Sequence, residues 1–264
     1  MDLRLRGKRA LVTGSTAGIG FAAAASLAEE GASVVINGRS AERVEEAVRR
    51  ALERAPEAEV SGVAADLGAT EGVEELLRQV PEIDVLVNNL GIFEPKDFQE
   101  ITDDDWVRFF ETNVMSGVRL ARHYIPGMKE RDWGRIVFVS SESAVQIPAE
   151  MIHYGVTKTA QLVVARGLAE TIVGTGVTVN SVLPGPTASE GVKTFVGRMA
   201  QEQGKDEDAM EQEFFQTSHP SSLLQRFIEP EEVAEMIAFV CSLVSSATNG
   251  ASLRADGVVV RSVV

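Results

Sequence analysis

The chain has one cysteine, two tyrosines, two tryptophans and three histidines among its 264 residues. A single cysteine excludes an internal disulfide and a cysteine-based metal cluster. Cys241 lies in the apolar run MIAFVCSLV, so we expect it to be a buried packing residue. His123 and His219 have no acidic or cysteine partner at the spacing that metal ligands need, and we therefore expect no metal site.

Basic residues are also scarce, because 25 Lys and Arg stand against 39 Asp and Glu and give a formal net charge of −14. A chain this acidic repels a phosphate backbone, so we expect no nucleic-acid partner. The stretch MDLRLRGKRA lacks the apolar segment of a signal peptide. The uncharged stretches 171–189 and 236–253 are interrupted by Gly, Asn, Ser or Pro and do not predict membrane helices. We expect a cytoplasmic protein.

Short apolar runs rich in Val and Ile alternate with amphipathic segments such as 41–55. Seven runs predict strands, at 9–14, 33–38, 59–66, 83–89, 134–141, 176–185 and 251–257. They lack polar alternation, which is typical of strands buried on both faces. The sequence therefore predicts an α/β fold over residues 1–264, a single domain with a Rossmann-like, doubly wound parallel sheet of seven strands and helices on both faces.

One segment breaks this alternation. Residues 186–228 run for about forty positions before the next expected helix, EPEEVAEMIAFV. Connections of this length are usually functional or mobile. The segment carries apolar residues, including Phe195 and Phe214, so we expect a flap that closes over the substrate.

The run LVTGSTAGIG at 11–20 places three glycines where the first strand passes into a helix. Gly14, Gly18 and Gly20 allow backbone N–H groups to approach a pyrophosphate at the helix N-terminus. After the second strand an acidic residue would bind the ribose hydroxyls of NAD, but VVINGRS offers Arg39. A guanidinium suits a 2′-phosphate, so the sequence favours NADP(H), with NAD(H) as the alternative.

Tyr154 and Lys158 are four residues apart in HYGVTK, and a helix places both side chains on one face. A nearby ammonium favours the phenolate, so we expect Lys158 to lower the pKa of Tyr154 and prepare it for proton transfer to a ketone. Ser141 ends the fifth strand and would hydrogen-bond the substrate oxygen. Asn113 lies inside a predicted helix, an unfavourable place for asparagine unless the residue has a role.

Together these motifs resemble those of the short-chain dehydrogenase/reductase family in its form of roughly 250 residues. The resemblance rests on TGSTAGIG at 13–20, Asp66 in ADL, NNLG at 88–91, Asn113 in ETNVMSG, Ser141, YGVTK at 154–158 and PGPT at 184–187. It implies hydride transfer between a nicotinamide and a ketone or secondary alcohol, with Asn113, Ser141, Tyr154 and Lys158 as the catalytic residues. It also implies a homotetramer, or a homodimer, built partly through helices near 103–130 and 151–174.

The expected cofactor contacts come from the glycine-rich turn and the carboxyl ends of the strands. They are Gly14, Ser15, Gly18, Ile19, Gly20, Arg39, Asp66, Leu67, Asn88, Gly91, Tyr154, Lys158, Pro184, Gly185 and Thr187. The expected substrate pocket is lined by Ile92, Phe93, Gln146, Ile147, Met151, Phe195 and Phe214. This lining is mainly apolar, so we expect a small-molecule carbonyl or alcohol substrate of apolar or medium-sized character.

Two other functions stay open. Similar chains include 3-oxoacyl-[acyl-carrier-protein] reductases, which present basic residues before the fifth and sixth strands to bind an acidic carrier. This chain has Asp132 and Thr175 there, and its net charge of −14 opposes such docking. A non-catalytic dinucleotide sensor is the second alternative, since a fold alone does not determine function. The presence of all four expected catalytic residues speaks against it.

Overall fold

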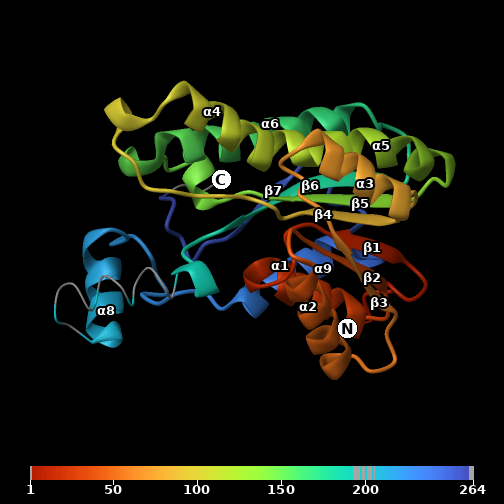
Figure 1. Ribbon diagram of the computed structural model, residues 1–264, viewed down its shortest axis with the longest axis horizontal. Coiled ribbons are helices and arrows are strands. Elements are labelled where there is room, and N and C mark those ends of the chain that lie inside the picture. Colours follow the sequence, from red (N-terminus) through yellow and green to blue (C-terminus); the bar gives the residue numbers. More distant parts are fainter. Residues whose placement is uncertain (1, 193–196, 198–199, 201–203, 205, 262–264) are drawn as a thin grey trace.

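A single parallel sheet runs through the computed structural model, which describes residues 2–192, 197, 200, 204 and 206–261 (Figure 1). Its strand order is β3-β2-β1-β4-β5-β6-β7. The strands are Arg9–Val12 (β1), Ser33–Gly38 (β2), Val60–Ala64 (β3), Val85–Asn88 (β4), Gly134–Val139 (β5), Val177–Pro184 (β6) and Ser252–Ala255 (β7). The predicted seven-stranded, doubly wound sheet is confirmed. The order reverses between β1 and β4, where sheets of this kind form a ligand-binding crevice.

Helices cover both faces of this sheet (Figure 1). One face carries α1 (Gly18–Glu29), α2 (Ala41–Arg54) and α9 (Pro230–Cys241). The other carries α3 (Thr70–Gln79), α4 (Asp103–Phe110), α5 (Ser116–Glu130) and α6 (Ile152–Glu170). α8 (Glu207–Thr217) lies at one side of the molecule, at the left of Figure 1. The π-helical turn η2 (Glu111–Met115) joins α4 to α5.

Four short 3₁₀ turns complete the described structure: η1 (Phe98–Glu100), η3 (Glu142–Ala144), η4 (Ala149–Met151) and η5 (Leu243–Ser245). Two of them, η3 and η4, lie between β5 and α6. They therefore lie in the connection that leads from Ser141 to Tyr154. The predicted strand 134–141 ends two residues early, at Val139, because the chain turns into η3.

Alternating side chains of each central strand enter two separate cores. In β2, Val34 and Ile36 pack into the core that contains α1 and α9, whereas Val35 packs into the core that contains α3 and α5. Helices cover both faces of the sheet, so the side chains that point to either face are apolar. Successive residues of the strand are therefore all apolar, and the strand is a continuous apolar run in the sequence. Burying one such Val or Ile side chain contributes roughly 1.5–3 kcal/mol.

Two residues interpreted as packing residues from the sequence have that role. His153 is fully buried, with its ring centroid 4.0 Å from that of Phe109 and 6.1 Å from that of Trp106. Burial lowers the pKa of this histidine, which keeps the imidazole neutral. Cys241 is a free, buried thiol, and burial raises its pKa to about 12.

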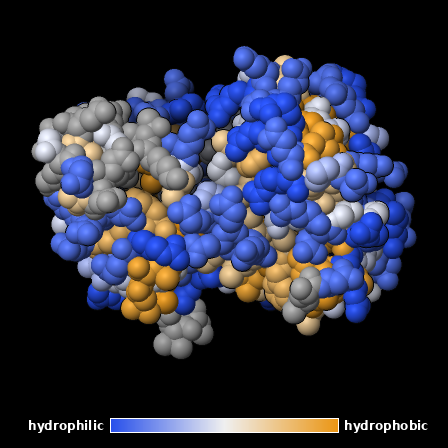
Figure 2. Space-filling model, turned by 90° about the horizontal axis from the view of Figure 1, so that it is seen from below, coloured by the Kyte–Doolittle hydropathy of each residue, from blue (hydrophilic) through white to orange (hydrophobic). Residues whose placement is uncertain are grey.

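The molecular surface is mostly hydrophilic on the face shown in Figure 2, where hydrophobic residues break through in separate patches. Within the described residues, every helix is too short or too polar to span a bilayer. The apolar side chains of the sheet and its flanking helices pack into the two cores instead.

Candidate active site

Ser141 and Tyr154 come from two elements that meet at the carboxyl end of β5. Ser140 joins these elements, because its hydroxyl donates to the backbone carbonyl of Lys158 in α6 at 2.8 Å. Ser141 follows at once and begins the turn η3, where its Oγ accepts a hydrogen bond from the Ser143 N–H at 3.1 Å. The Tyr154 phenol lies close enough to the Ser141 hydroxyl for this hydroxyl to lower its pKa. The structure therefore brings the two predicted hydroxyl groups together.

Lys158 lies one turn after Tyr154 in α6 and is 4% exposed. Its Nζ donates to the Val139 carbonyl at 2.9 Å and lies 5.6 Å from the centroid of the Tyr154 ring. Burial lowers the pKa of Lys158 to about 8, although the Glu142 carboxylate opposes this shift. The ammonium is therefore fixed beside the phenol, as the four-residue spacing predicts.

The prediction that Lys158 lowers the pKa of Tyr154 is wrong when only the groups of the protein itself act on the phenol. The pKa of Tyr154 is raised above its ordinary value of 10.0, first because the phenol is buried and second because the Glu142 carboxylate disfavours a second negative charge. The nearby Ser141 hydroxyl acts in the opposite direction but is the smallest of the three effects. Tyr154 therefore keeps its proton at neutral pH, which suits a proton donor.

Glu142 is a carboxyl group of the site that sequence reasoning missed. Its Oε2 accepts a hydrogen bond from Ser141 Oγ at 2.6 Å, and its Oε1 accepts one from Ser143 Oγ at 3.2 Å. Burial raises the pKa of this carboxyl, and the two hydroxyl donors oppose the shift. The signal in the sequence was a lone charge inside the otherwise uncharged run VSSESAVQIPA at 139–149.

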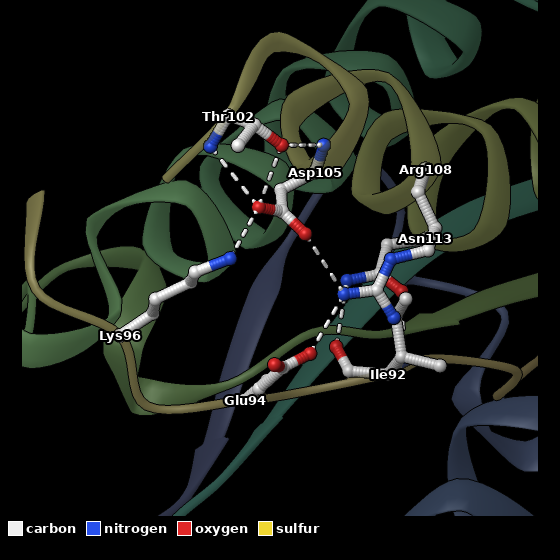
Figure 3. A network of polar contacts seen from close by, with 7 residues as sticks. All are labelled: Ile92, Glu94, Lys96, Thr102, Asp105, Arg108 and Asn113. Atoms are coloured by element: carbon white, nitrogen blue, oxygen red, sulfur yellow. Dashed lines mark hydrogen bonds and ion pairs between the residues drawn. The ribbon is translucent and has the colours of Figure 1, made fainter. Parts of the chain in front are cut away.

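Asn113 is 1% exposed and lies in the π-helical turn η2. Its side-chain amide forms a pair of hydrogen bonds with the backbone of Ile92, with Oδ1 accepting from N at 2.8 Å and Nδ2 donating to O at 3.0 Å (Figure 3). Nδ2 also donates to Thr157 Oγ1 at 3.0 Å, and the Asn113 carbonyl accepts from Gln161 Nε2 at 2.6 Å. Asn113 thus joins the segment after β4 to α6. π-turns of this kind are frequent at functional sites.

An ionic network holds the segment after β4 against α4 (Figure 3). Lys96 Nζ lies 2.6 Å from Asp105 Oδ2, and Arg108 lies 2.7 Å from Glu94 and 3.3 Å from Asp105. The hydrogen bond from Lys96 is the largest cause that lowers the pKa of Asp105, followed by the Thr102 backbone. Phe93, on the same segment, meets the Tyr154 ring edge-on with centroids 6.4 Å apart. The network therefore helps to place one wall of the site.

The glycine-rich turn has the geometry that the sequence predicts. Gly14 and Gly18 have φ values of +60° and +56°, which favour glycine. A Cβ at Gly20 would lie 2.4 Å from Asn89 Nδ2 and 2.6 Å from the Gly14 carbonyl. The Asn89 amide holds the turn by donating to the Thr13 and Gly14 carbonyls, both at 3.0 Å. α1 begins at Gly18 without a side-chain cap, so its first N–H groups can bind a pyrophosphate.

A protein-family model described as short chain dehydrogenase matches residues 8–199. The chain belongs to the short-chain dehydrogenase family. It is 51% identical over 263 residues to the uncharacterized oxidoreductase YvaG of Bacillus subtilis, with both chains covered completely. It is 32% identical over 261 residues to 3-oxoacyl-[acyl-carrier-protein] reductase FabG of Aquifex aeolicus, with 97% of this chain and 99% of that protein covered.

Among solved structures, the fold is similar to that of L-sorbose reductase from Gluconobacter frateurii in complex with NADPH and L-sorbose. The TM-score is 0.94 at 32% sequence identity, and each chain is covered completely. The predicted membership of the family is therefore confirmed. The chain is an oxidoreductase that acts on alcohol or carbonyl groups with a nicotinamide dinucleotide.

The remaining cofactor residues fit a dinucleotide at the crevice between β1 and β4. The buried Asn88 Nδ2 has no hydrogen-bond partner within the described part of the chain. A Cβ at Gly91 would lie 3.3 Å from Lys158 Nζ, a tight contact that glycine avoids. Arg39 is exposed just after β2 and takes part in no ion pair among the described residues. Asp66 is exposed after β3, where its Oδ1 accepts from the Gly68 N–H at 3.0 Å.

Other predicted family positions shape the backbone around this crevice. Ser15 Oγ donates to the Val12 carbonyl at 2.6 Å, and Thr187 Oγ1 donates to the Gly185 carbonyl at 2.9 Å. Gly185 follows β6, which ends at Pro184, and a Cβ there would lie 2.8 Å from the Asp256 Cα. Ile19 and Leu67 direct their side chains into the cores, so any contact they make with a dinucleotide comes from the backbone.

The predicted substrate-pocket residues are only partly brought together. Ile92 and Met151 are half-buried, Phe93 is 48% exposed, and Gln146 and Ile147 are exposed. The ring contacts of Phe214 are with Phe215, Phe227 and His219, at centroid distances of 5.2, 5.2 and 4.6 Å. Phe214 therefore belongs to the core of the flap. Phe195 lies outside the described residues.

Proposed function

We propose that the protein reduces a ketone with NADPH and, in the reverse direction, oxidises a secondary alcohol with NADP⁺. The observation that carries this proposal is that the Lys158 Nζ lies 5.6 Å from the centroid of the Tyr154 ring, with the Ser141 hydroxyl close enough to the phenol to lower its pKa. Two hydroxyl groups and one ammonium then meet at the carboxyl end of the sheet. Such a group of donors matches the charge that develops on a carbonyl oxygen during reduction.

The bound dinucleotide would supply the hydride. The phenol of Tyr154 would give its proton to the substrate oxygen as negative charge develops there. Ser141 would donate a second hydrogen bond to the same oxygen, and one such donor contributes about 10²–10³-fold to kcat. By family resemblance, Lys158 would hold the nicotinamide ribose. The raised pKa of Tyr154 supports the reductive direction, because the phenol starts protonated at neutral pH.

NADP(H) is the proposed cofactor, with NAD(H) as the alternative. Arg39 follows β2, where an NAD-specific site would place a carboxylate, and it has no ion-pair partner in the described residues. A guanidinium in that position suits the 2′-phosphate of NADP(H). L-sorbose reductase, a solved structure that the chain matches along its whole length, was determined with NADPH.

The proposed substrate is an apolar or medium-sized ketone. Phe93 lies edge-on to Tyr154, and Ile92 and Met151 add half-buried apolar surface nearby in the chain. A panel of ketones assayed with NADPH would rank aromatic and aliphatic ketones above small polyhydroxy ketones. The reverse ranking would contradict the proposal of an apolar or medium-sized ketone.

Polyhydroxy ketones are the second candidate class, favoured by one specific observation. The Glu142 carboxyl lies next to Ser141 and Tyr154, and a carboxyl group accepts hydrogen bonds from substrate hydroxyls. The likeness to L-sorbose reductase along the whole chain supports the same class. In the ketone panel, preference for L-sorbose or fructose over cyclohexanone would select this candidate.

A 3-oxoacyl carrier-protein reductase is a third candidate, supported by the 32% identity to FabG. The net charge of −14 opposes it, since an acidic carrier would be repelled. Asp132, at the turn before β5, uses its carboxylate to accept from the Gly176 N–H at 2.6 Å. Faster reduction of a carrier-linked acyl ketone than of the free acyl ketone at low salt would establish this activity.

We also propose a cytoplasmic homotetramer, or a homodimer, of single-domain chains that associate through the surface of α4, α5 and α6. Val107 and Val163 are 61% and 68% exposed there, and a groove on α5 and α6 is lined by Val118, Ile125 and Val164. Val163→Glu would place a charge on this surface and is expected to yield monomers by light scattering. Val173→Glu, at another exposed valine beyond α6, is the matched control.

A further inference from the structure

We infer that Glu142 is a positioning residue that decides whether Ser141 can donate a hydrogen bond to the substrate. This inference rests on the proposed ketone reduction, because it concerns the donor that meets the carbonyl oxygen. A serine hydroxyl has one hydrogen to donate. In the structure that hydrogen points to Glu142 Oε2 across 2.6 Å.

The other neighbours of Ser141 leave its single hydrogen with Glu142. Ser141 Oγ accepts from the Ser143 N–H at 3.1 Å, and the Tyr154 phenol lies nearby. An ionised Glu142 only accepts hydrogen bonds, so it holds the single hydrogen of Ser141. The substrate oxygen would then receive a hydrogen bond from Tyr154 alone, although the site contains two hydroxyl groups.

Protonation of Glu142 reverses the direction of the same contact. A protonated carboxyl has one O–H donor, which can donate to Ser141 Oγ while keeping the heavy atoms in place. Ser141 then turns its own hydrogen toward the substrate oxygen. In this step Glu142 takes one proton from the solvent and forms its O–H bond. No other covalent bond is made or broken.

Burial favours the protonated form of Glu142, whereas the hydrogen bonds from Ser141 and Ser143 favour the carboxylate. Its two carboxyl oxygens bond the hydroxyls of Ser141 and Ser143, and no ion pair to it occurs among the described residues. The titratable groups that face it are Tyr154 and Lys158, both from α6. The strand β6, which also packs against η3, has the sequence VTVNSVLP and contributes no titratable group. Burial raises the pKa of Glu142, so the two forms exchange nearer to neutral pH.

The direct test is the pH dependence of kcat/KM for ketone reduction in the wild type, Glu142→Gln, Ser141→Ala and the double variant. A glutamine keeps a donor beside Ser141 at every pH. We expect the wild-type value to fall by about 10²- to 10³-fold as Glu142 ionises, and we expect Glu142→Gln to remove this fall. In the Ser141→Ala background, Glu142→Gln should have no such effect.

Glu142→Gln also removes a negative charge that acts on Tyr154 and Lys158, and the double variant separates the two effects. If the glutamine alters the profile equally with and without Ser141, Glu142 acts by charge alone and the inference is wrong. An unchanged fall in Glu142→Gln would also overturn it. Glu150→Gln, at an exposed carboxyl in η4, is the matched control and should keep the wild-type profile.

A second measurement needs no turnover and therefore separates failure of this inference from failure of the proposed function. The raised folded pKa of Glu142 means that its contribution to stability is present below the ordinary value of 4.5 and is lost as pH rises through the folded pKa. In urea unfolding, the wild type should lose stability relative to Glu142→Gln from pH 4.5 upward. A difference that does not change with pH would contradict the inference.

Ser143→Ala serves if Glu142→Gln does not fold. It removes the 3.2 Å hydrogen bond that stabilises the carboxylate and leaves Ser141 intact. The pKa of Glu142 should rise further, so the fall in kcat/KM should move to higher pH. A fall at unchanged or lower pH would count against the inference.

Discussion

The Nζ of Lys158 lies 5.6 Å from the centroid of the Tyr154 ring, where Lys158 is buried and Tyr154 is half-buried. The energetic consequence falls on the lysine as much as on the tyrosine. Burial lowers the pKa of Lys158 from 10.5 to about 8, whereas burial and Glu142 raise the pKa of Tyr154. The folded chain therefore holds an unfavourable charge at the place where the proposed mechanism uses an ammonium.

Lys158→Met should stabilise the fold at the expense of activity. The shift of 10.5 to about 8 corresponds to up to about 3 kcal/mol at pH 7, reduced by loss of the hydrogen bond to Val139. Because the folded pKa is lowered, the cost is present while the lysine is charged in both states. The advantage of methionine should shrink as pH rises from 8 to 10.5. Urea unfolding between pH 7 and 10.5 measures the difference in the free energy of unfolding between Lys158→Met and the wild type. A difference that stays constant over this pH range would contradict the prediction.

Gly20→Ala should abolish dinucleotide binding. Its Cβ would lie 2.4 Å from Asn89 Nδ2 and 2.6 Å from the Gly14 carbonyl, so the turn must open to accept it. Quenching of tryptophan fluorescence by NADPH measures the dissociation constant, which should rise by about 100-fold or more. Gly167→Ala in α6 is the control, because nothing lies within 4 Å of its new Cβ. Equal affinity of the two variants would show that the turn does not hold the cofactor.

Arg39→Ala should weaken NADPH more than NADH. A charged hydrogen bond to the 2′-phosphate contributes about 1.5–3 kcal/mol, so KM for NADPH should rise by roughly 10- to 100-fold. KM for NADH should stay near the wild-type value. Arg49→Ala removes an exposed guanidinium of α2 that pairs with Glu46 and Glu53, and it provides the control for charge. A parallel rise for both cofactors in Arg39→Ala would refute the proposed role.

Much of this architecture was predictable because it follows from local patterns. The strands were found from apolar runs, since residues such as Val34 and Val35 must each enter a different core. Gly14, Gly18 and Gly20 were found because a tight turn that approaches a ligand requires glycine. The four-residue spacing of helical positions placed Tyr154 and Lys158 on one face.

The missing parts depend on packing that spacing does not encode. Glu142 lies in a 3₁₀ turn, and only the fold shows that its carboxyl points to Ser141. Burial of the phenol, together with the negative charge of Glu142, reverses the expected direction of the Tyr154 pKa. Phe214 was predicted to line the substrate pocket, but an aromatic in a long connection can equally pack with its own segment, as it does against Phe215 and Phe227.

Tyr154→Phe tests the central claim most directly, because it removes one hydroxyl and keeps the ring that meets Phe93. NADPH affinity by fluorescence should match the wild type, while single-turnover reduction of the best ketone should be slower by at least about 10²–10⁴-fold. The same loss, with binding intact, would separate an enzyme from a dinucleotide sensor. Reduction at the wild-type rate by Tyr154→Phe would contradict the account, because the proton would then come from another group.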